Sequence, residues 1–346
     1  MSAQVLILYT GGTIGMVQTE QGLAPASGLQ ERIEMALGAS INTLPSFEVL
    51  EISPLIDSAN ITPKHWTKLV SILATHWQDY DGFIILHGTD TMAYTASALS
   101  FMLGACTKNI ILTGSQIPLG MNRSDASSNL EAALSLAVSH KIPDVSLVFA
   151  GKLMRGSRIQ KVSSHCIEAF HTPNDDLLGK LDIEMRLYPD RMIKSKEDDM
   201  KNPATSIENN IVSFKTGAVG IITLHPSQPT AIYQSLLDDE DCKAIVLLTY
   251  GAGNVPDQNP AFLSFLTEAM LRKKNIVNLT QCLHGGVSQG AYAAGSILSS
   301  MNVLSGRDMT LEAAFCKLHW LIAKGENYYG ILEKWNTNYC GEFSSL

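Results

Sequence analysis

The stretch QVLILYTGGTIG, residues 4–15, joins a short run of aliphatic residues to a glycine-rich loop. The run at residues 4–9 is rich in Val, Leu and Ile and is typical of a β-strand, and Gly11, Gly12 and Gly15 mark the loop after it. The same pattern returns downstream, where short apolar runs alternate with longer amphipathic segments. This alternation predicts parallel strands joined by crossover helices, and therefore an α/β fold.

The predicted elements fall into two sets. The first has strands at residues 4–9, 47–52, 82–87, 109–113 and 144–149 and helices at 65–77, 91–103 and 125–140. The second has strands at 219–224, 244–250 and 275–279 and helices at 230–237, 261–273 and 310–323. Residues between the sets are polar and mixed in charge, which is typical of a linker. Because chains longer than roughly 250 to 300 residues split into domains, we predict an N-terminal domain at 1–188, a linker at 189–210 and a C-terminal domain at 211–346.

The composition argues against several classes of protein. The chain has 346 residues with 25 Lys+Arg, 33 Asp+Glu and a net charge of −8, and it lacks the basic clusters of a nucleic-acid binder. No apolar run approaches the roughly 20 residues of a membrane helix, and the N-terminus lacks the basic start of a signal peptide. Six cysteines without a C-x-x-C pair favour a reducing compartment. We therefore expect a cytoplasmic protein that binds neither nucleic acid nor membrane.

Polar loops come after four strands of the first predicted domain. They are TGGTIG at residues 10–15, HGTDT at 87–91 and TGSQ at 113–116, with Asp57 and Ser58 a few residues beyond the second strand. In open α/β sheets, ligands bind outside the carboxyl ends of the strands. The four loops are therefore expected to converge on a functional site at one edge of the sheet.

Two motifs suggest other chemistry. The glycines of residues 10–15 lack the G-x-G-x-x-G spacing and no P-loop sequence occurs, so no nucleotide cofactor is expected. GVSQG, residues 286–290, matches the nucleophile elbow of α/β-hydrolases, with Asp308 and His319 after Ser288 in the chain. Ser288 lies well beyond its predicted strand, however, so a glycine-rich loop is the favoured interpretation. The nine histidines show no metal-ligand spacing, and no metal is assigned.

The polar loops carry several hydroxyl groups and an acid but no histidine that could act as a base. Such a set of groups is suited to amide hydrolysis. A threonine Oγ can attack a carbonyl carbon while backbone N–H groups stabilise the oxyanion. A lysine can serve as the base in such a site, as in Ser–Lys systems. The basic residues best placed to reach these loops are those of RGSRIQK, residues 155–161.

At these residues the chain resembles the bacterial-type L-asparaginase family, and most closely its cytoplasmic type I branch. TGGTIG at 10–15 is similar to the first family signature and GFIILHGTDT at 82–91 to the second. The likeness extends through TGSQIP at 113–118, MRGSR at 154–158 with Lys161, and YGAGN at 250–254. The resemblance implies an N-terminal doubly wound domain with a mostly parallel sheet, a smaller C-terminal α/β domain, no cofactor, and active sites completed by a neighbouring subunit in a tetramer built of dimers.

The resemblance also implies roles for individual residues. The implied reaction is hydrolysis of L-asparagine, a small-molecule amino-acid substrate, to aspartate and ammonia. Thr13 is the expected nucleophile, and Thr89, Asp90 and Lys161 are the expected triad beside it. The residues expected to bind the substrate are Asp57, Ser58, Gly88, Thr89, Asp90, Ser115 and Asn254, the last from the neighbouring subunit. Carboxylates suit the substrate's ammonium group, and hydroxyl or N–H donors suit its carboxylate.

One position departs from the family pattern. Many members carry a tyrosine in the loop after the first threonine, where Leu23 stands here. Leucine cannot relay a proton, so we hypothesise that Tyr292 of the neighbouring subunit supplies a hydroxyl. The loop itself, with Gly22, Pro25 and Gly28, has the composition of an active-site lid.

Three alternative functions share these motifs: a glutaminase-asparaginase, the amidase subunit of a tRNA-dependent amidotransferase, and a catalytically silent amino-acid sensor. The amidotransferase subunit usually has an additional N-terminal domain, whereas the TGG motif begins at residue 10 here. Intact Thr13, Thr89, Asp90 and Lys161 argue against a silent sensor. The ratio of asparaginase to glutaminase activity stays open, because one methylene changes the binding free energy by only about 1 to 3 kcal/mol. Cooperative regulation also stays open.

Overall fold

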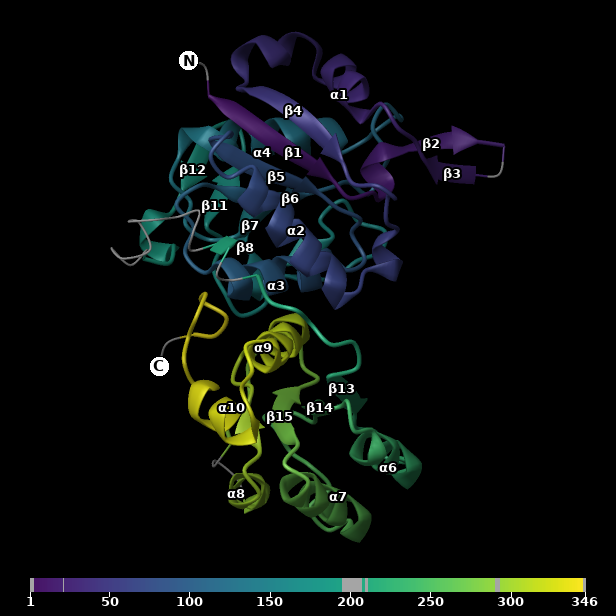
Figure 1. Cartoon of the computed structure of the whole chain (residues 1–346), viewed down its shortest axis with the longest axis vertical. Coiled ribbons are helices and arrows are strands. Elements are labelled where there is room, and N and C mark those ends of the chain that lie inside the picture. Colours follow the sequence, from purple (N-terminus) through teal and green to yellow (C-terminus); the bar gives the residue numbers. More distant parts are fainter. Residues whose placement is uncertain (1–2, 21, 195–206, 209–210, 290–292, 345–346) are drawn as a thin grey trace. The chain divides into compact units, whose positions relative to one another are not determined.

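The computed structural model describes residues 3–20, 22–194, 207–208, 211–289 and 293–344. The chain divides into two compact units, Met1–Ile211 and Val212–Leu346 (Figure 1). Each unit has a parallel or mostly parallel sheet and its own hydrophobic core. The predicted α/β fold class is therefore confirmed.

The N-terminal unit is built on an eight-stranded sheet in the order β12-β11-β8-β7-β6-β5-β1-β4. Its five parallel strands are β4 (Ser46–Glu51), β1 (Gln4–Tyr9), β5 (Gly82–Leu86), β6 (Ile110–Thr113) and β7 (Ser146–Phe149). The chain passes from β1 to β4 on one side and then to β5 on the other side. This reversal makes the sheet doubly wound, and a ligand site is expected at the carboxyl ends of β1 and β5.

Antiparallel strands complete this unit. β8 (Lys152–Arg155), β11 (Gly179–Leu181) and β12 (Met185–Leu187) extend the sheet at one edge. Two small hairpins lie outside it: β2 (Met16–Thr19) with β3 (Gly22–Pro25), and β9 (Gln160–Lys161) with β10 (Phe170–His171). The β2–β3 hairpin projects from the body of the unit (Figure 1).

Helices cover both faces of the large sheet. α1 (Leu29–Leu37) and α4 (Ala126–Ser139) share a core with alternate residues of β1, β5 and β6. α2 (Pro63–Thr75) and α3 (Met92–Leu103) cover the opposite face, where Trp77 stacks on Phe83 with ring centroids 5.2 Å apart. His65, the first residue of the predicted helix, contributes to the cap of α2, because its Nδ1 accepts the Thr62 backbone N–H at 2.9 Å.

The C-terminal unit contains a four-stranded parallel sheet in the order β13-β14-β15-β16. Its strands are β13 (Val219–Thr223), β14 (Ala244–Thr249), β15 (Asn275–Thr280) and β16 (Leu304–Ser305). Its helices are α6 (Thr230–Asp238), α7 (Pro260–Leu271), α8 (Ala293–Ser300), α9 (Leu311–Ala323) and α10 (Tyr328–Lys334). Of these, α8, α10 and β16 were not predicted.

A buried ion pair fastens the end of the chain to α9. The side chains of Lys317 and Glu342 are both fully buried, with Nζ 2.7 Å from Oε1. Lys317 also donates to the carbonyl oxygens of Trp335 and Thr337, each at 2.7 Å, and lies over three aromatic rings. Burial lowers the pKa of Lys317, and the Glu342 carboxylate opposes that shift. The ammonium thus joins the helix to the segment that lies beyond α10.

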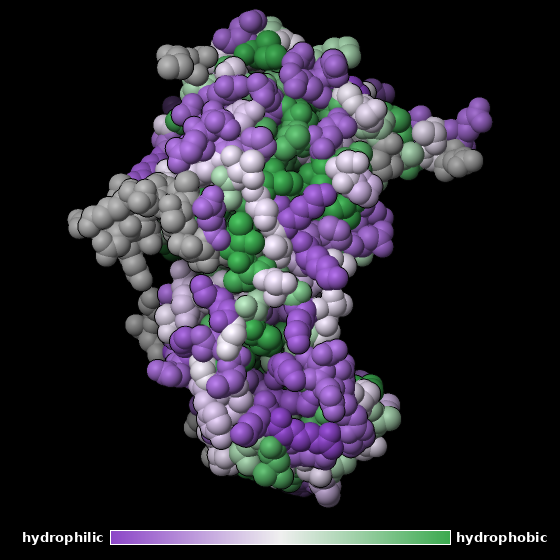
Figure 2. Space-filling model, viewed as in Figure 1, coloured by the Kyte–Doolittle hydropathy of each residue, from purple (hydrophilic) through white to green (hydrophobic). Residues whose placement is uncertain are grey.

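The surface differs between the two units on the face shown in Figure 2. Hydrophilic residues cover most of the C-terminal unit there, whereas hydrophobic residues reach the surface in the middle of the N-terminal unit. None of the helices in the described part of the chain combines the length and the apolar character needed to cross a membrane.

Candidate functional site

Three loops of the N-terminal unit meet through glycine backbones that leave no room for side chains. A Cβ atom on Gly11 would lie 2.3 Å from the carbonyl oxygen of Ile56, and one on Gly12 would lie 2.4 Å from the backbone of Gly88. A Cβ atom on Gly88 would lie 2.5 Å from Oγ of Ser58. Gly11 and Gly12 also have φ angles of +121° and +94°, which other residues rarely adopt. These glycines therefore allow the loops after β1, β4 and β5 to touch.

Hydrogen bonds fix the loops in this arrangement. The Thr10 Oγ1 donates to the carbonyl of Leu86 at 2.9 Å, and the Ile56 N–H donates to the carbonyl of Thr10 at 2.7 Å. The Thr91 hydroxyl donates to the carbonyl of Ser58 at 2.7 Å. The convergence predicted from the positions of these loops is therefore found.

Thr13 is the first residue of the short 3-10 helix η1 (Thr13–Gly15), directly after the glycine pair. It is partly exposed, whereas the neighbouring Ile14 is fully buried. The carbonyl of Ile14 accepts the Leu119 N–H at 3.1 Å, which ties this turn to the loop after β6. Thr13 is thus held in a fixed turn and is partly accessible to a ligand.

Lys161 reaches the loop after β5 from the small β9–β10 hairpin. Its Nζ donates to Oγ1 of Thr89 at 2.8 Å and to Oδ1 of Asp90 at 2.7 Å. Thr89 is 6% exposed, whereas the Asp90 side chain is 61% exposed and faces solvent. Lys161 thus lies within hydrogen-bonding distance of both other residues expected to form the triad.

The two arginines of the same RGSRIQK stretch point elsewhere. Arg155 pairs with Asp144 and Asp175 in the interior of the unit, and Arg158 donates to the carbonyl of Asn174. Burial raises the pKa of Asp144, and the Arg155 guanidinium opposes that shift. Within this stretch, Lys161 contacts the loop after β5 through its side chain, at Thr89 and Asp90.

His87, which sequence reasoning missed, orients the backbone of the site. Its Nδ1 lies 2.7 Å from the carbonyl of Gly88, and its Nε2 lies 2.9 Å from Oγ1 of Thr95. Because a carbonyl can only accept, Nδ1 carries the proton, and Nε2 accepts from the Thr95 hydroxyl. Burial lowers the pKa of His87 to about 4, so the ring is neutral near pH 7. His87 is a positioning residue for Gly88.

The loop after β6 is held from the start of α4. The Asp125 carboxylate accepts the backbone N–H groups of Gln116 and Ile117, each at 3.0 Å, and Asn129 donates to the same carboxylate at 3.2 Å. Within this loop, Ser115 is 1% exposed, and its Oγ has no hydrogen-bond partner among the described residues. A buried hydroxyl in this condition is suited to bind a polar atom of a ligand.

Asp57 and Ser58 lie in the loop that touches Gly11 and Gly88. The Asp57 carboxylate caps the 3-10 helix η3 (Ser58–Asn60) by accepting the Ala59 N–H at 3.2 Å, and it remains exposed. Ser58 is 3% exposed. An exposed carboxylate with further acceptor capacity can bind an ammonium group.

The segment after Thr13 is the β2–β3 hairpin rather than the predicted loop. Leu23, at the expected tyrosine position, lies on β3 and is 44% exposed. Arg32 of α1 donates to the carbonyls of Gly15 and Ala26, at 3.0 and 2.8 Å, on the two sides of the hairpin base. The base is therefore fixed to α1.

The predicted residues of the neighbouring subunit belong to the C-terminal unit. Asn254 comes after β14, is exposed, and pairs with Tyr250, whose N–H donates to the Asn254 carbonyl at 3.0 Å. Tyr292 lies outside the described residues.

Ser288 is not part of a nucleophile elbow. It lies in an irregular segment well beyond the end of β15, where its N–H donates to the carbonyl of Ala252 at 3.0 Å. Asp308 accepts the Ser344 N–H at 3.0 Å. The strand–turn–helix context that an elbow requires is absent from this described segment.

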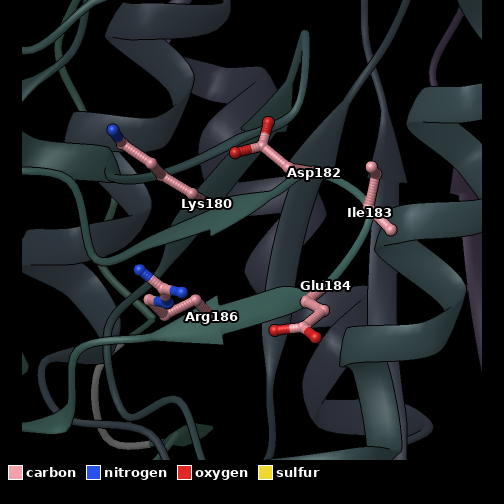
Figure 3. Close-up of a pocket in the computed structure, with 5 residues that line it drawn as sticks. All are labelled: Lys180, Asp182, Ile183, Glu184 and Arg186. Carbon is pink, nitrogen blue, oxygen red and sulfur yellow. The ribbon is translucent and has the colours of Figure 1, made fainter.

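A hollow beside the β11–β12 hairpin is lined by Lys180, Asp182, Ile183, Glu184 and Arg186 (Figure 3). All five residues come from one hairpin at the edge of the sheet, and none carries a hydroxyl or thiol. This hollow therefore lacks the hydroxyl or thiol nucleophile that the predicted chemistry uses. Within the described ranges, no group of three or more His, Cys, Asp or Glu side chains is placed to hold a metal ion.

Comparison with known proteins assigns both units to one family. The model of the asparaginase N-terminal domain matches residues 4–192, and that of the glutaminase/asparaginase C-terminal domain matches residues 218–332. The chain is 40% identical to L-asparaginase 1 of Escherichia coli (strain K12) over 98% of both proteins. The crystal structure of L-asparaginase I from Vibrio cholerae matches with a TM-score of 0.86 and 37% identity over 100% of both chains.

A longer human relative carries a different name. The chain is 37% identical to the human 60 kDa lysophospholipase, over 93% of this chain and 58% of that protein. The two family models and the full-length likeness to type I enzymes agree with the signatures read from the sequence. The chain is therefore an enzyme that belongs to the asparaginase family.

Proposed function

We propose that this chain is an L-asparagine amidohydrolase that converts L-asparagine and water to L-aspartate and ammonia. The observation that carries the proposal is the contact of Lys161 with Thr89 and Asp90, at 2.8 and 2.7 Å, in a loop packed against Gly12. The partly exposed hydroxyl of Thr13 comes directly after Gly12. Relatives named as L-asparaginases support the same reaction.

In the first half of the reaction, Thr13 Oγ attacks the carboxamide carbon of asparagine. The C–N bond breaks, ammonia leaves with the hydroxyl proton of Thr13, and the aspartyl group stays on Thr13 as an ester. Backbone N–H groups of the converging loops stabilise the oxyanion that forms during attack. No cofactor takes part.

In the second half, water attacks the ester and aspartate leaves. A neutral Lys161 accepts a proton through the Thr89 hydroxyl, and a proton returns to Thr13 Oγ as the ester breaks. The Asp90 carboxylate orients Lys161 through its contact of 2.7 Å with Nζ. Arginine could not replace this lysine, because a guanidinium does not give up its proton in proteins.

The substrate is a small zwitterion, and the converging loops supply groups for both of its charges. Asp57 and Asp90 accept from its ammonium, while Ser58, Gly88 and Thr89 donate to its carboxylate. The buried Ser115 lies next to the carboxamide, where its Oγ gains a partner.

The proposal extends to the assembly and its location. The sites are completed in a homo-oligomer, a tetramer built of dimers, by Asn254 and Tyr292 of the partner subunit. The chain is organised as an N-terminal domain at 1–188, a linker at 189–210 and a C-terminal domain at 211–346. It acts in the cytoplasm with neither nucleic acid nor membrane as partner. Minor glutaminase activity and cooperative kinetics belong to the same proposal.

The test measures ammonia release from L-asparagine, L-glutamine and D-asparagine over a range of concentrations. We expect rapid turnover of L-asparagine, loss of turnover in Thr13→Ala, and a loss of roughly 10²- to 10⁴-fold in kcat for Lys161→Met. Lys152→Met is the matched control, since Lys152 pairs with Glu168 rather than with the triad, and it should behave as the wild type.

Three outcomes would contradict the proposal. A folded wild type without turnover would favour a sensor, and hydrolysis of a lysophospholipid in place of asparagine would favour the activity named for the human relative. A stable, active monomer in light scattering would refute the site shared between subunits.

A further inference from the structure

We propose that Gln116 is a positioning residue that holds the Thr89 hydroxyl in its resting orientation and so sets the pH at which Lys161 and Thr89 become active. The inference rests on the proposed amidohydrolase function and adds a residue to its site. Gln116 is partly exposed and lies in the loop after β6.

The hydrogen bonds of Gln116 determine which way its side-chain amide faces. Its Nε2 donates to the carbonyl of Cys166 at 3.0 Å. Because a carbonyl only accepts, this contact turns Oε1 toward Thr89, whose hydroxyl donates to it at 3.4 Å. The backbone N–H of Gln116 is in turn held by Asp125 at 3.0 Å. The side chain is thus anchored at both ends, with its one acceptor aimed at the triad.

The carbonyl that anchors Gln116 is itself fixed. Cys166 lies between β9 and β10, the hairpin that carries Lys161. The Ser163 Oγ accepts the N–H groups of His165 and Cys166, at 3.2 and 2.9 Å, which closes a compact turn. The Val162 N–H donates to the carbonyl of Ala169 across the base of this turn at 2.8 Å. Lys161 and the anchor of Gln116 therefore belong to one hairpin.

The hydroxyl proton of Thr89 has two acceptors, and the charge on Lys161 decides between them. A protonated lysine has no lone pair, so it donates to Thr89 Oγ1, and the Thr89 proton points to Gln116 Oε1. A neutral lysine accepts the Thr89 proton, which is the arrangement that the reaction needs. Gln116 then loses its partner at Thr89. Gln116 therefore stabilises the resting, protonated state, and its amide opposes activation.

The titratable group in direct contact with the Lys161 ammonium is Asp90. The same hairpin also carries His165, Cys166, Glu168, which pairs with Lys152, and His171. These groups are unchanged by a substitution at position 116. A difference between wild type and variant therefore reports on Gln116.

Two variants shift the pH profile of kcat/KM in opposite directions. Gln116→Met keeps the length of the side chain but removes the acceptor, so the acid limb should move to lower pH by about half a unit. Gln116→Glu adds a negative charge that favours protonated Lys161, so the acid limb should move to higher pH by about one unit. Gln234→Met on α6, where the amide donates to the exposed Asp238 in the other unit of the chain, is the control and should keep the wild-type profile.

A second readout does not depend on turnover. The rate at which an amine-reactive reagent modifies Lys161 is measured by mass spectrometry of the digested protein at several pH values. The same opposite shifts are expected, since only the neutral amine reacts. Equal profiles, or shifts of both variants in one direction, would overturn the role of Gln116. A wild type without asparagine turnover would refute the proposed function instead, and the labelling would still decide the orientation of the Thr89 proton.

Discussion

Replacing Lys317 with methionine is expected to destabilise the C-terminal unit by about 3 to 5 kcal/mol. Methionine fills a similar volume, so the change removes the ammonium and keeps most of the packing. The ammonium makes three hydrogen bonds of 2.7 Å, to the carbonyls of Trp335 and Thr337 and to the Glu342 carboxylate. Hydrogen bonds to charged groups contribute about 1.5 to 3 kcal/mol each, and desolvation of the ammonium offsets part of that sum. The carboxylate of Glu342 would stay buried without its cation.

The measurement combines urea unfolding with hydrogen exchange detected by mass spectrometry on peptides from residues 328–344. The exchange data report local opening of residues 328–344 even where the rest of the C-terminal unit stays folded. Lys334→Met is the matched control, because Lys334 is 44% exposed and its pair with Glu326 is screened by water. Its stability should stay near that of the wild type.

A double variant tests the electrostatic part of the argument. Combining Lys317→Met with Glu342→Gln removes the buried charge that the single variant leaves behind, so the double variant should be more stable than Lys317→Met alone. A loss below about 1 kcal/mol in Lys317→Met, or a double variant that loses the full sum of the two single losses, would refute the reasoning.

Two further predictions concern His87 and Gly12. Burial lowers the pKa of His87 from 6.5 to about 4, so the unfolded chain takes up this proton at a higher pH than the folded chain. The resulting stability is complete above pH 6.5 and is lost as the pH falls toward 4, by about 3 kcal/mol in all. In urea unfolding between pH 7 and 4, His87→Gln should lack this pH-dependent part of the free energy of unfolding. The same change of that free energy with pH in both proteins would contradict the prediction. Gly12→Ala places a Cβ atom 2.4 Å from the Gly88 backbone at a φ of +94°, and turnover should be abolished, whereas Gly38→Ala, with φ +52° and open surroundings, should stay active. An active Gly12→Ala enzyme would show that the loops tolerate separation.

Much of the sheet could be predicted from sequence because its signals are local. The run at residues 4–9 forms β1 with the predicted bounds, and the loops after β1, β5 and β6 begin directly at the ends of their strands. The edge at which ligands bind is then given by the parallel arrangement. By contrast, α1 was missed because it begins after Gly28, a left-handed residue without a capping side chain, and so gives no start signal.

Contacts distant in sequence explain the rest of what could not be predicted. Lys161 lies 72 residues from Thr89; the residues alone pointed only to the stretch 155–161, and the family resemblance was needed to single out Lys161. The sequence predicts Asp125 as the start of a helix, but its carboxylate also holds the loop at Gln116. His87 was missed because its contact with Thr95 and its buried surroundings exist only in the folded chain.

The contacts of Arg32 indicate how the segment after Thr13 can change during evolution. The turn that bears Thr13 runs straight into β2, so any motion of the hairpin would otherwise be transmitted to Thr13. Because Arg32 holds the carbonyls of Gly15 and Ala26, motion of the hairpin beyond these residues is not passed on to the turn of Thr13. The hairpin can then be treated as an exchangeable module, which would allow leucine to stand at position 23 without moving Thr13. Hairpins grafted between relatives at these two residues should therefore leave the turn of Thr13 in place.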